Sequence, residues 1–108
     1  MKAKTCQLVL TTCPSLRAAK RIARVLVEER LAACVNIVPI AQSVYRWHGR
    51  IESAPEQLLI IKSLKRSYAN IEKRLRALHP YELPEVIAVP ITTGLRDYLA
   101  WIDHPDKP

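Results

Sequence analysis

Glycine is scarce in this chain and its cysteines form no close pair, and each lack excludes classes of protein. With two glycines in 108 residues, a glycine-rich phosphate-binding loop is almost excluded, and the P-loop, G-x-S-x-G and H-E-x-x-H motifs are all missing. The three cysteines, Cys6, Cys13 and Cys34, include no C-x-x-C pair, so they make a poor disulfide framework and a poor zinc signature. We therefore expect a protein that is not an enzyme and that resides in the cytoplasm with reduced thiols.

Long apolar runs are also lacking. The basic N-terminus is followed by an apolar run too short for a signal peptide, and no stretch approaches the roughly 18 apolar residues of a membrane span. The net charge is +7, yet the basic residues are scattered among apolar positions and form no run longer than two. Four of them share one side of the first expected helix, which is typical of a solvated face, with an anion-binding stripe as the alternative: Arg17, Lys20, Arg21 and Arg24. We expect no membrane association.

The apolar periodicity predicts seven segments of regular structure. Strands are expected over residues 6–12, 33–47, 50–63 and 85–91, and helices over 16–31, 68–78 and 95–102. This order predicts an α+β fold, a ferredoxin-like βαββαβ sandwich with a C-terminal helix, as a single domain over residues 1–108. Pro39 and Pro90 fall on the second and fourth strands, which this topology places at the sheet edges, where proline is tolerated. Ser15 and Ser67 stand where helix N-caps are expected.

The second and third strands form a hairpin, residues 41–58, that is too long for two short helices to cover. Tyr45 and Trp47 share one side of it, and Ile51 lies across the turn. Burial between subunits is the interpretation we favour, and a nucleic-acid platform is the rival. RNA-recognition versions of this fold stack bases on aromatics of the two central strands, and these strands, "CQLVLTT" and "LLIIKS", contain none. We therefore expect no nucleic-acid partner.

Two segments carry residues suited to metal chemistry. Cys34, in "LAACVNI", is a soft metal ligand, a nucleophile or a buried structural thiol. His79 opens "HPYELPE", where Pro80 is expected to end the second helix. Cys6 and Cys13 are seven residues apart, so on one strand they point to opposite faces and cannot chelate one ion together. A thiol with an imidazole would suit copper or zinc.

The segments "LAACVNI", "SVYRWHGRIE", "LLIIKS", "HPYELPEVIAVPI" and "YLAWI", in this order and spacing, resemble the CutA family, the divalent-cation tolerance proteins. The resemblance covers roughly residues 6–102. It implies a ferredoxin-like fold, a tight homotrimer with PII-like architecture, and hairpins and edge strands that pair between subunits. It also implies tolerance of copper and other divalent metals, with no organic cofactor and no established catalytic activity.

Residue by residue, the resemblance implies that Cys34 and His79 are the metal ligands, for Cu²⁺ or another divalent cation. Cys6 and Cys13 do not fall clearly on a family cysteine position. The alternative function is a PII-like signalling or scaffold trimer that binds a small ligand or a partner in clefts between subunits. The residues expected to line such clefts are Tyr45, Trp47, Tyr81, Glu85 and Trp101.

Overall fold

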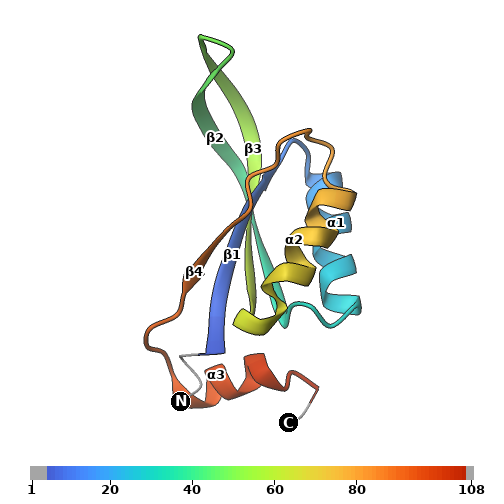
Figure 1. Ribbon diagram of the computed structural model, residues 1–108, viewed down its shortest axis with the longest axis vertical. Helices are drawn as coiled ribbons and strands as arrows, with labels where there is room; N and C mark the ends of the chain where they lie inside the picture. The colour runs from blue at the N-terminus through green and yellow to red at the C-terminus, as the bar shows by residue number, and fades with distance from the viewer. Residues whose placement is uncertain (1–4, 107–108) are drawn as a thin grey trace.

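The computed structural model describes residues 5–106, apart from the side chain of Ile40. In chain order the elements are β1 (Cys6–Cys13), α1 (Leu16–Glu28), β2 (Cys34–Trp47), β3 (Arg50–Leu64), the short 3-10 turn η2 (Lys65–Ser67), α2 (Tyr68–Leu78), β4 (Ile87–Pro90) and α3 (Arg96–Asp103) (Figure 1). The four strands of this described part form an antiparallel sheet in the order β2-β3-β1-β4. This is the expected ferredoxin-like order, with β1 and β3 in the centre.

The ends of the helices follow local capping chemistry. Ser15 caps α1, because its side chain accepts a hydrogen bond from the N–H of Ala18 at 3.1 Å. The helix ends at Glu28, earlier than expected, because Arg30 adopts a left-handed conformation (φ 61°) that turns the chain. Ser67 stands at the N-cap position of α2 as expected, but it lies in η2 with helical angles, so its side chain makes no capping hydrogen bond. Pro80 follows α2 as expected.

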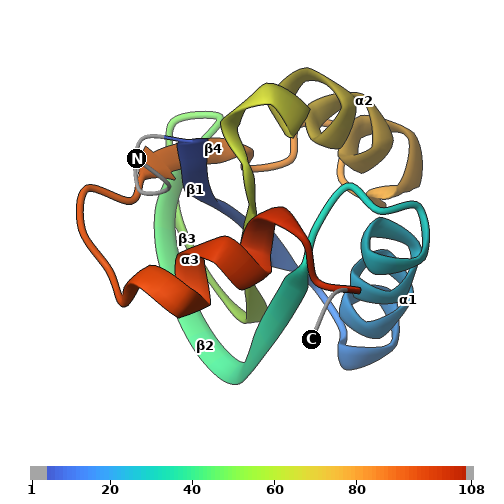
Figure 2. The ribbon, with the colours of Figure 1, turned by 90° about the horizontal axis from the view of Figure 1, so that it is seen from below.

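The main core lies between one face of the sheet and the helices α1 and α2. Its buried residues come from β1, β3 and both helices: Val9, Cys13, Leu59, Ile61, Ala19, Ile22, Leu26, Ile71 and Leu75, with Ala32. The helix residues recur at spacings of three and four, which places them along one apolar side. The two helices lie together on one side of the strands in Figure 2.

The opposite face of the sheet is covered at one end only, by α3. Leu99 and Ile102 pack there against Cys6 and Leu64, and the helix crosses the end of the sheet (Figure 2). Beyond α3 the same face presents apolar side chains that are half-buried or exposed. We call these residues the open face: Leu8, Leu10, Val38, Leu58, Ile60, Ile87 and Val89.

The β2–β3 hairpin projects well beyond the sheet and makes the molecule 46 Å long and 26 × 24 Å across (Figure 1). The pairing of β2 with β3 shifts register between Val38 and Ala41, around Pro39. Pro39 on β2 and Pro90 at the end of β4 both lie on edge strands, which confirms that expectation. Pro55 lies on β3 within the hairpin, where it pairs with Gln42. At the tip, His48 and Gly49 both have positive φ, so the turn is tight.

Candidate functional site

A groove lies at the base of the hairpin, where the end of β1, the hairpin and the loop between α2 and β4 meet. Its volume is about 710 Å³. We call it the hairpin groove and define it by its lining residues: Thr12, Gln42, Ser43, Val44, Tyr45, Trp47, Glu56, Tyr81, Glu82, Leu83 and Glu85. Four of the five residues expected in a cleft are here, namely Tyr45, Trp47, Tyr81 and Glu85. Whether a second subunit borders the groove stays a prediction.

The hairpin groove has the opposite charge to the rest of the protein. Its lining includes three carboxylates, Glu56, Glu82 and Glu85, and no lysine, arginine or histidine. The chain as a whole carries a net charge of +7. The field within the groove therefore favours cations over anions.

Glu56 is the buried carboxylate of the groove. It lies on β3, where only 6% of its surface is exposed, and its Oε2 atom accepts a hydrogen bond of 2.6 Å from the hydroxyl of Tyr81. Burial and the neighbouring Glu56 together raise the pKa of Tyr81 well above its ordinary value, so the phenol keeps its proton and donates it. The hydroxyl of Tyr81 therefore has the hydrogen-bond partner that a packed tyrosine needs.

Both ring nitrogens of His79 make hydrogen bonds within the protein. Its Nδ1 accepts a hydrogen bond of 3.1 Å from the backbone N–H of Tyr81, so Nε2 carries the proton and donates to the carbonyl oxygen of Thr12 at 2.6 Å. A metal ion could bind this neutral ring only if one of the two hydrogen bonds were broken. The ring is 7% exposed, which makes such a loss costly.

Cys13 is the thiol that contacts His79, a pairing that no sequence pattern indicated. The two atoms Sγ and Nε2 are 3.8 Å apart. Burial, reinforced by the charge of Glu56, raises the pKa of the Cys13 thiol to about 11. Because the nearest ring N–H is already donated to Thr12, the pair is a packed contact and Cys13 is not an activated thiolate.

Cys34 lies far from His79 within one subunit. It opens β2, pairs with Lys62 across to β3, and Lys62 in turn pairs with Leu8 near the start of β1. His79 contacts Thr12 and Cys13, at the other end of β1. The structure therefore does not bring the two expected ligands together in a single chain.

The ammonium group of Lys62 donates a hydrogen bond of 3.0 Å to the hydroxyl of Tyr98. This bond raises the pKa of Lys62, against the lowering effect of burial, and electrostatic interactions with Tyr98 and Cys34 add to the rise. The half-buried thiol of Cys34 thus faces a lysine that stays charged.

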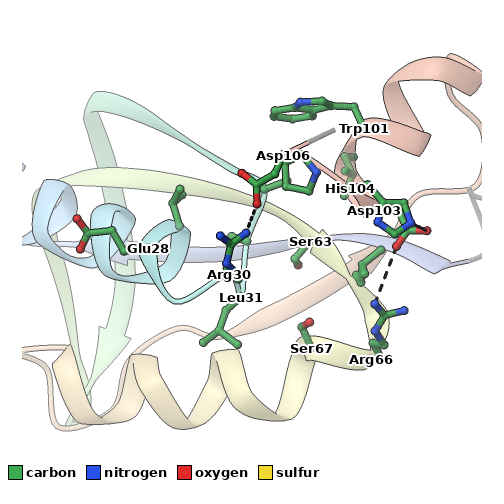
Figure 3. A pocket seen from close by; sticks show the side chains of 16 residues that line it. Glu28, Arg30, Leu31, Ser63, Arg66, Ser67, Trp101, Asp103, His104 and Asp106 are labelled. Atoms are coloured by element: carbon green, nitrogen blue, oxygen red, sulfur yellow. Dashed lines mark hydrogen bonds and ion pairs between the residues drawn. The ribbon is translucent and has the colours of Figure 1, made fainter. Parts of the chain in front are cut away.

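Trp101 does not join the other expected cleft residues within one subunit. It lines a second cavity of about 790 Å³ between the end of α1, the end of β3 and α3 (Figure 3). The cations of that cavity are already paired, since Arg30 contacts Asp106 and Arg66 lies 3.9 Å from Asp103. This cavity therefore offers less unpaired charge than the hairpin groove.

Two properties of residues 5–106 bear on binding. No three histidine, cysteine, aspartate or glutamate side chains gather in one place in a way that could hold a metal ion. None of the helices in this range is long and apolar enough to cross a membrane.

Glu56 is a residue of the groove that the sequence reading did not single out. Its position in the sequence could have indicated it, because it is a carboxylate two residues before Leu58, on the side of β3 shared by Leu58 and Ile60.

Comparison with known proteins gives one consistent answer. Residues 7–105 match the family model described as CutA1 divalent ion tolerance protein. The divalent-cation tolerance protein CutA of Thermus thermophilus is 49% identical over 96 residues, which cover 89% of this chain and 93% of that protein. The crystal structure of CutA from Xylella fastidiosa matches with a TM-score of 0.89 at 50% identity, over 92% of this chain and 95% of its own. CutA1 from Oryza sativa matches with a TM-score of 0.92 at 39% identity, over 99% and 98% of the two chains.

Proposed function

The chain belongs to the CutA1 divalent ion tolerance family, and on that premise we propose that it acts as a homotrimer that binds Cu²⁺ or another divalent cation. The family match carries the link to divalent cations. Trimeric assembly and ion binding are more specific than the family match, and a separate structural observation supports each.

The open face supports self-association. A soluble domain buries the apolar side of its sheet, and α1 and α2 do so on one side only. On the other side Ile87 and Val89 are 51% and 44% exposed, and Val38 is 41% exposed. Packing of this face against further copies of the chain would remove that apolar surface from water.

The hairpin supports the same conclusion. Val44 and Ile51 are 69% and 72% exposed. A projecting ribbon of this length that carries so much apolar surface is stable when it lies against another subunit. Its outer strand β2 and the opposite edge strand β4 also offer unpaired backbone groups.

The position of Cys34 favours an ion site shared between subunits. Cys34 lies across from Lys62, on the side of the sheet that carries the open face, so a trimer that buries this face would bring thiols of several copies closer together. One subunit alone supplies too few ligands, because no cluster of three forms within residues 5–106. We keep His79 as the second proposed ligand, on the condition that it gives up one ring hydrogen bond.

Calorimetric titration of the assembled protein tests the proposal. Zn²⁺ under reducing conditions is the first probe, because Cu²⁺ oxidises thiols. Cys34→Ser is expected to weaken binding at least tenfold, and His79→Gln to weaken it while preserving a donor to Thr12. Cys6→Ala is the matched control, since Cys6 is buried under α3 in a separate cluster. Unchanged affinity in both ligand variants would remove Cys34 and His79 from the site.

Light scattering tests the assembly in the same samples. A mass close to three times 12.3 kDa is expected at micromolar subunit concentration. A monomer under these conditions would contradict the trimer, because it would leave the open face in water.

A further inference from the structure

We propose that the hairpin groove binds a small organic cation, a molecule that joins an ammonium or guanidinium group to a flat or apolar body. This goes beyond the tolerance of metal ions and concerns a different part of the molecule from Cys34. Three observations carry it: an unpaired buried carboxylate, aromatic walls, and a cavity of suitable size.

The charge of the groove is uncompensated by the protein itself. Glu56 is 6% exposed, yet within residues 5–106 no lysine, arginine or histidine forms an ion pair with it, or with Glu82 or Glu85. Its hydrogen bond from Tyr81 uses Oε2 and leaves Oε1 available. A buried carboxylate without a cation is unfavourable, and a cationic ligand that enters the groove relieves this. In a chain rich in arginine and lysine, the lack of such a partner is a specific property of this site.

The walls of the groove are suited to the organic part of such a ligand. Tyr45 and Trp47 line it from the hairpin and are each 44% exposed, and Tyr81 lines it from the loop before β4. The faces of tyrosine and tryptophan attract ammonium and guanidinium groups within about 6 Å of the ring centre. Aromatic rings combined with carboxylates are the arrangement that recognises organic cations.

The size of the groove favours a molecule over a bare ion. Its volume of about 710 Å³ lies within the range of roughly 300–1,000 Å³ typical of small-molecule sites. Aromatic rings do not ligate hard divalent cations, and no three-ligand cluster forms within residues 5–106. An arginine or lysine side chain from a neighbouring copy would fill only part of this space, so the proposed occupant of the groove is a free small molecule.

Tryptophan fluorescence and calorimetry of the full-length protein in its native assembly test the proposal. The probes are 2-phenylethylammonium and agmatine, with 2-phenylethanol as the uncharged analogue of the first. Both cations are expected to bind saturably, and the alcohol at least tenfold more weakly than the ammonium. The signal is expected from Trp47, so Trp101→Phe retains the response and Trp47→Phe loses it.

Glu56→Gln is the decisive variant, since glutamine still accepts the hydrogen bond from Tyr81 while the charge is lost. It is expected to weaken both cations at least tenfold. Glu28→Gln, which removes an exposed carboxylate of α1 outside the groove, is the matched control and is expected to change nothing. Far-UV circular dichroism and light scattering confirm that each variant folds and assembles like the parent.

Each contrary result overturns the proposal. Absence of binding up to millimolar probe, equal affinity for the alcohol, or unchanged affinity in Glu56→Gln would each do so. Probe binding that appears only when Glu56→Gln loosens the assembly would show that a neighbouring subunit's cation occupies the groove instead. If the organic cations do not bind, the proposal of a metal site at Cys34 is unaffected. If Cys34→Ser loses Zn²⁺ binding, the proposal of an organic-cation site is unaffected.

Discussion

His79 connects the loop between α2 and β4 to the end of β1, since its Nε2 atom donates a 2.6 Å hydrogen bond to the carbonyl oxygen of Thr12. The backbone N–H of Tyr81 donates to the other ring nitrogen. This loop supplies Tyr81, Glu82 and Glu85 to the hairpin groove. The imidazole therefore shapes the groove, whatever its role toward a metal ion.

Removing the imidazole is expected to destabilise the protein. His79→Ala leaves the Thr12 carbonyl and the Tyr81 N–H without partners, which should lower the free energy of unfolding by roughly 2–3 kcal/mol. His79→Gln is expected to lose less free energy of unfolding, because its amide can still donate to the carbonyl oxygen of Thr12. Urea unfolding at one fixed subunit concentration measures both variants. Equal losses would show that the bond to Thr12 contributes nothing.

The buried thiol of Cys13 predicts a loss of stability in alkali. Its pKa is raised from 9.0 to about 11, so the folded state keeps the proton that the unfolded chain releases near pH 9. The stability from this group is complete below pH 9 and is lost as the pH rises toward 11, by about 1.4 kcal/mol per pH unit at most. Denaturant unfolding under reducing conditions at several pH values measures the slope.

The matched variant for this measurement is Cys13→Ala, which has no thiol to ionise. The pKa of Tyr81 is raised as well, so the parent and the variant should both weaken in alkali. The parent is expected to weaken more steeply between pH 9 and 11. Parallel curves for the two proteins would mean that Cys13 ionises in the folded state as easily as in the unfolded chain.

Two serines that look alike in the sequence should differ in their effect on stability. Ser15 caps α1 through its side chain, so Ser15→Ala is expected to cost about 1 kcal/mol of unfolding free energy. Ser67 precedes α2 but makes no capping hydrogen bond, so Ser67→Ala should change stability by less than about 0.5 kcal/mol. Chemical denaturation of the two variants beside the parent decides the matter. A larger loss for Ser67→Ala would contradict the structure.

Much of the fold was predictable because local rules and topology agree. Pro39 and Pro90 marked the edge strands, and the periodicity of apolar residues located both core helices. Ser67 was placed correctly at the N-cap of α2, but its missing capping bond was not foreseen, because periodicity does not reveal the 3-10 turn before the helix. Strand β4 is shorter than expected: regular pairing starts at Ile87, opposite Leu10.

The site was less predictable, because its contacts join residues far apart in the chain. Cys13 and His79 are 66 residues apart, and Glu56 and Tyr81 are 25 apart, so no local pattern connects them. Tyr45, Trp47, Tyr81 and Glu85, which the sequence singled out as residues of an intersubunit cleft, share one groove, and their place between subunits stays a prediction. Cytoplasmic location and direct metal ligation by Cys34 stay predictions.

Thr11 offers a stabilising substitution. It is completely buried on β1, and its hydroxyl has no hydrogen-bond partner within the described part of the chain. Thr11→Val keeps the shape and removes the buried polar atom, so the free energy of unfolding should rise by about 1 kcal/mol. Thr12→Val, one residue on at the half-buried edge of the groove, is the control and should change little. Destabilisation by Thr11→Val would mean that the hydroxyl has a partner, such as water.

The open face predicts which substitution dissociates the assembly. Ile87 is 51% exposed on β4 and pairs with Leu10 across to β1, so Ile87→Asp would bury a carboxylate among apolar side chains if copies pack there. Light scattering is expected to report a monomer. Leu16→Asp is the control: Leu16 is 42% exposed in the first turn of α1, where an acidic residue is favourable, and its variant should stay trimeric. If Ile87→Asp also remained a trimer, the subunits would have to meet through the hairpin alone, and Cys34 would lose the shared environment that its proposed role as a ligand requires.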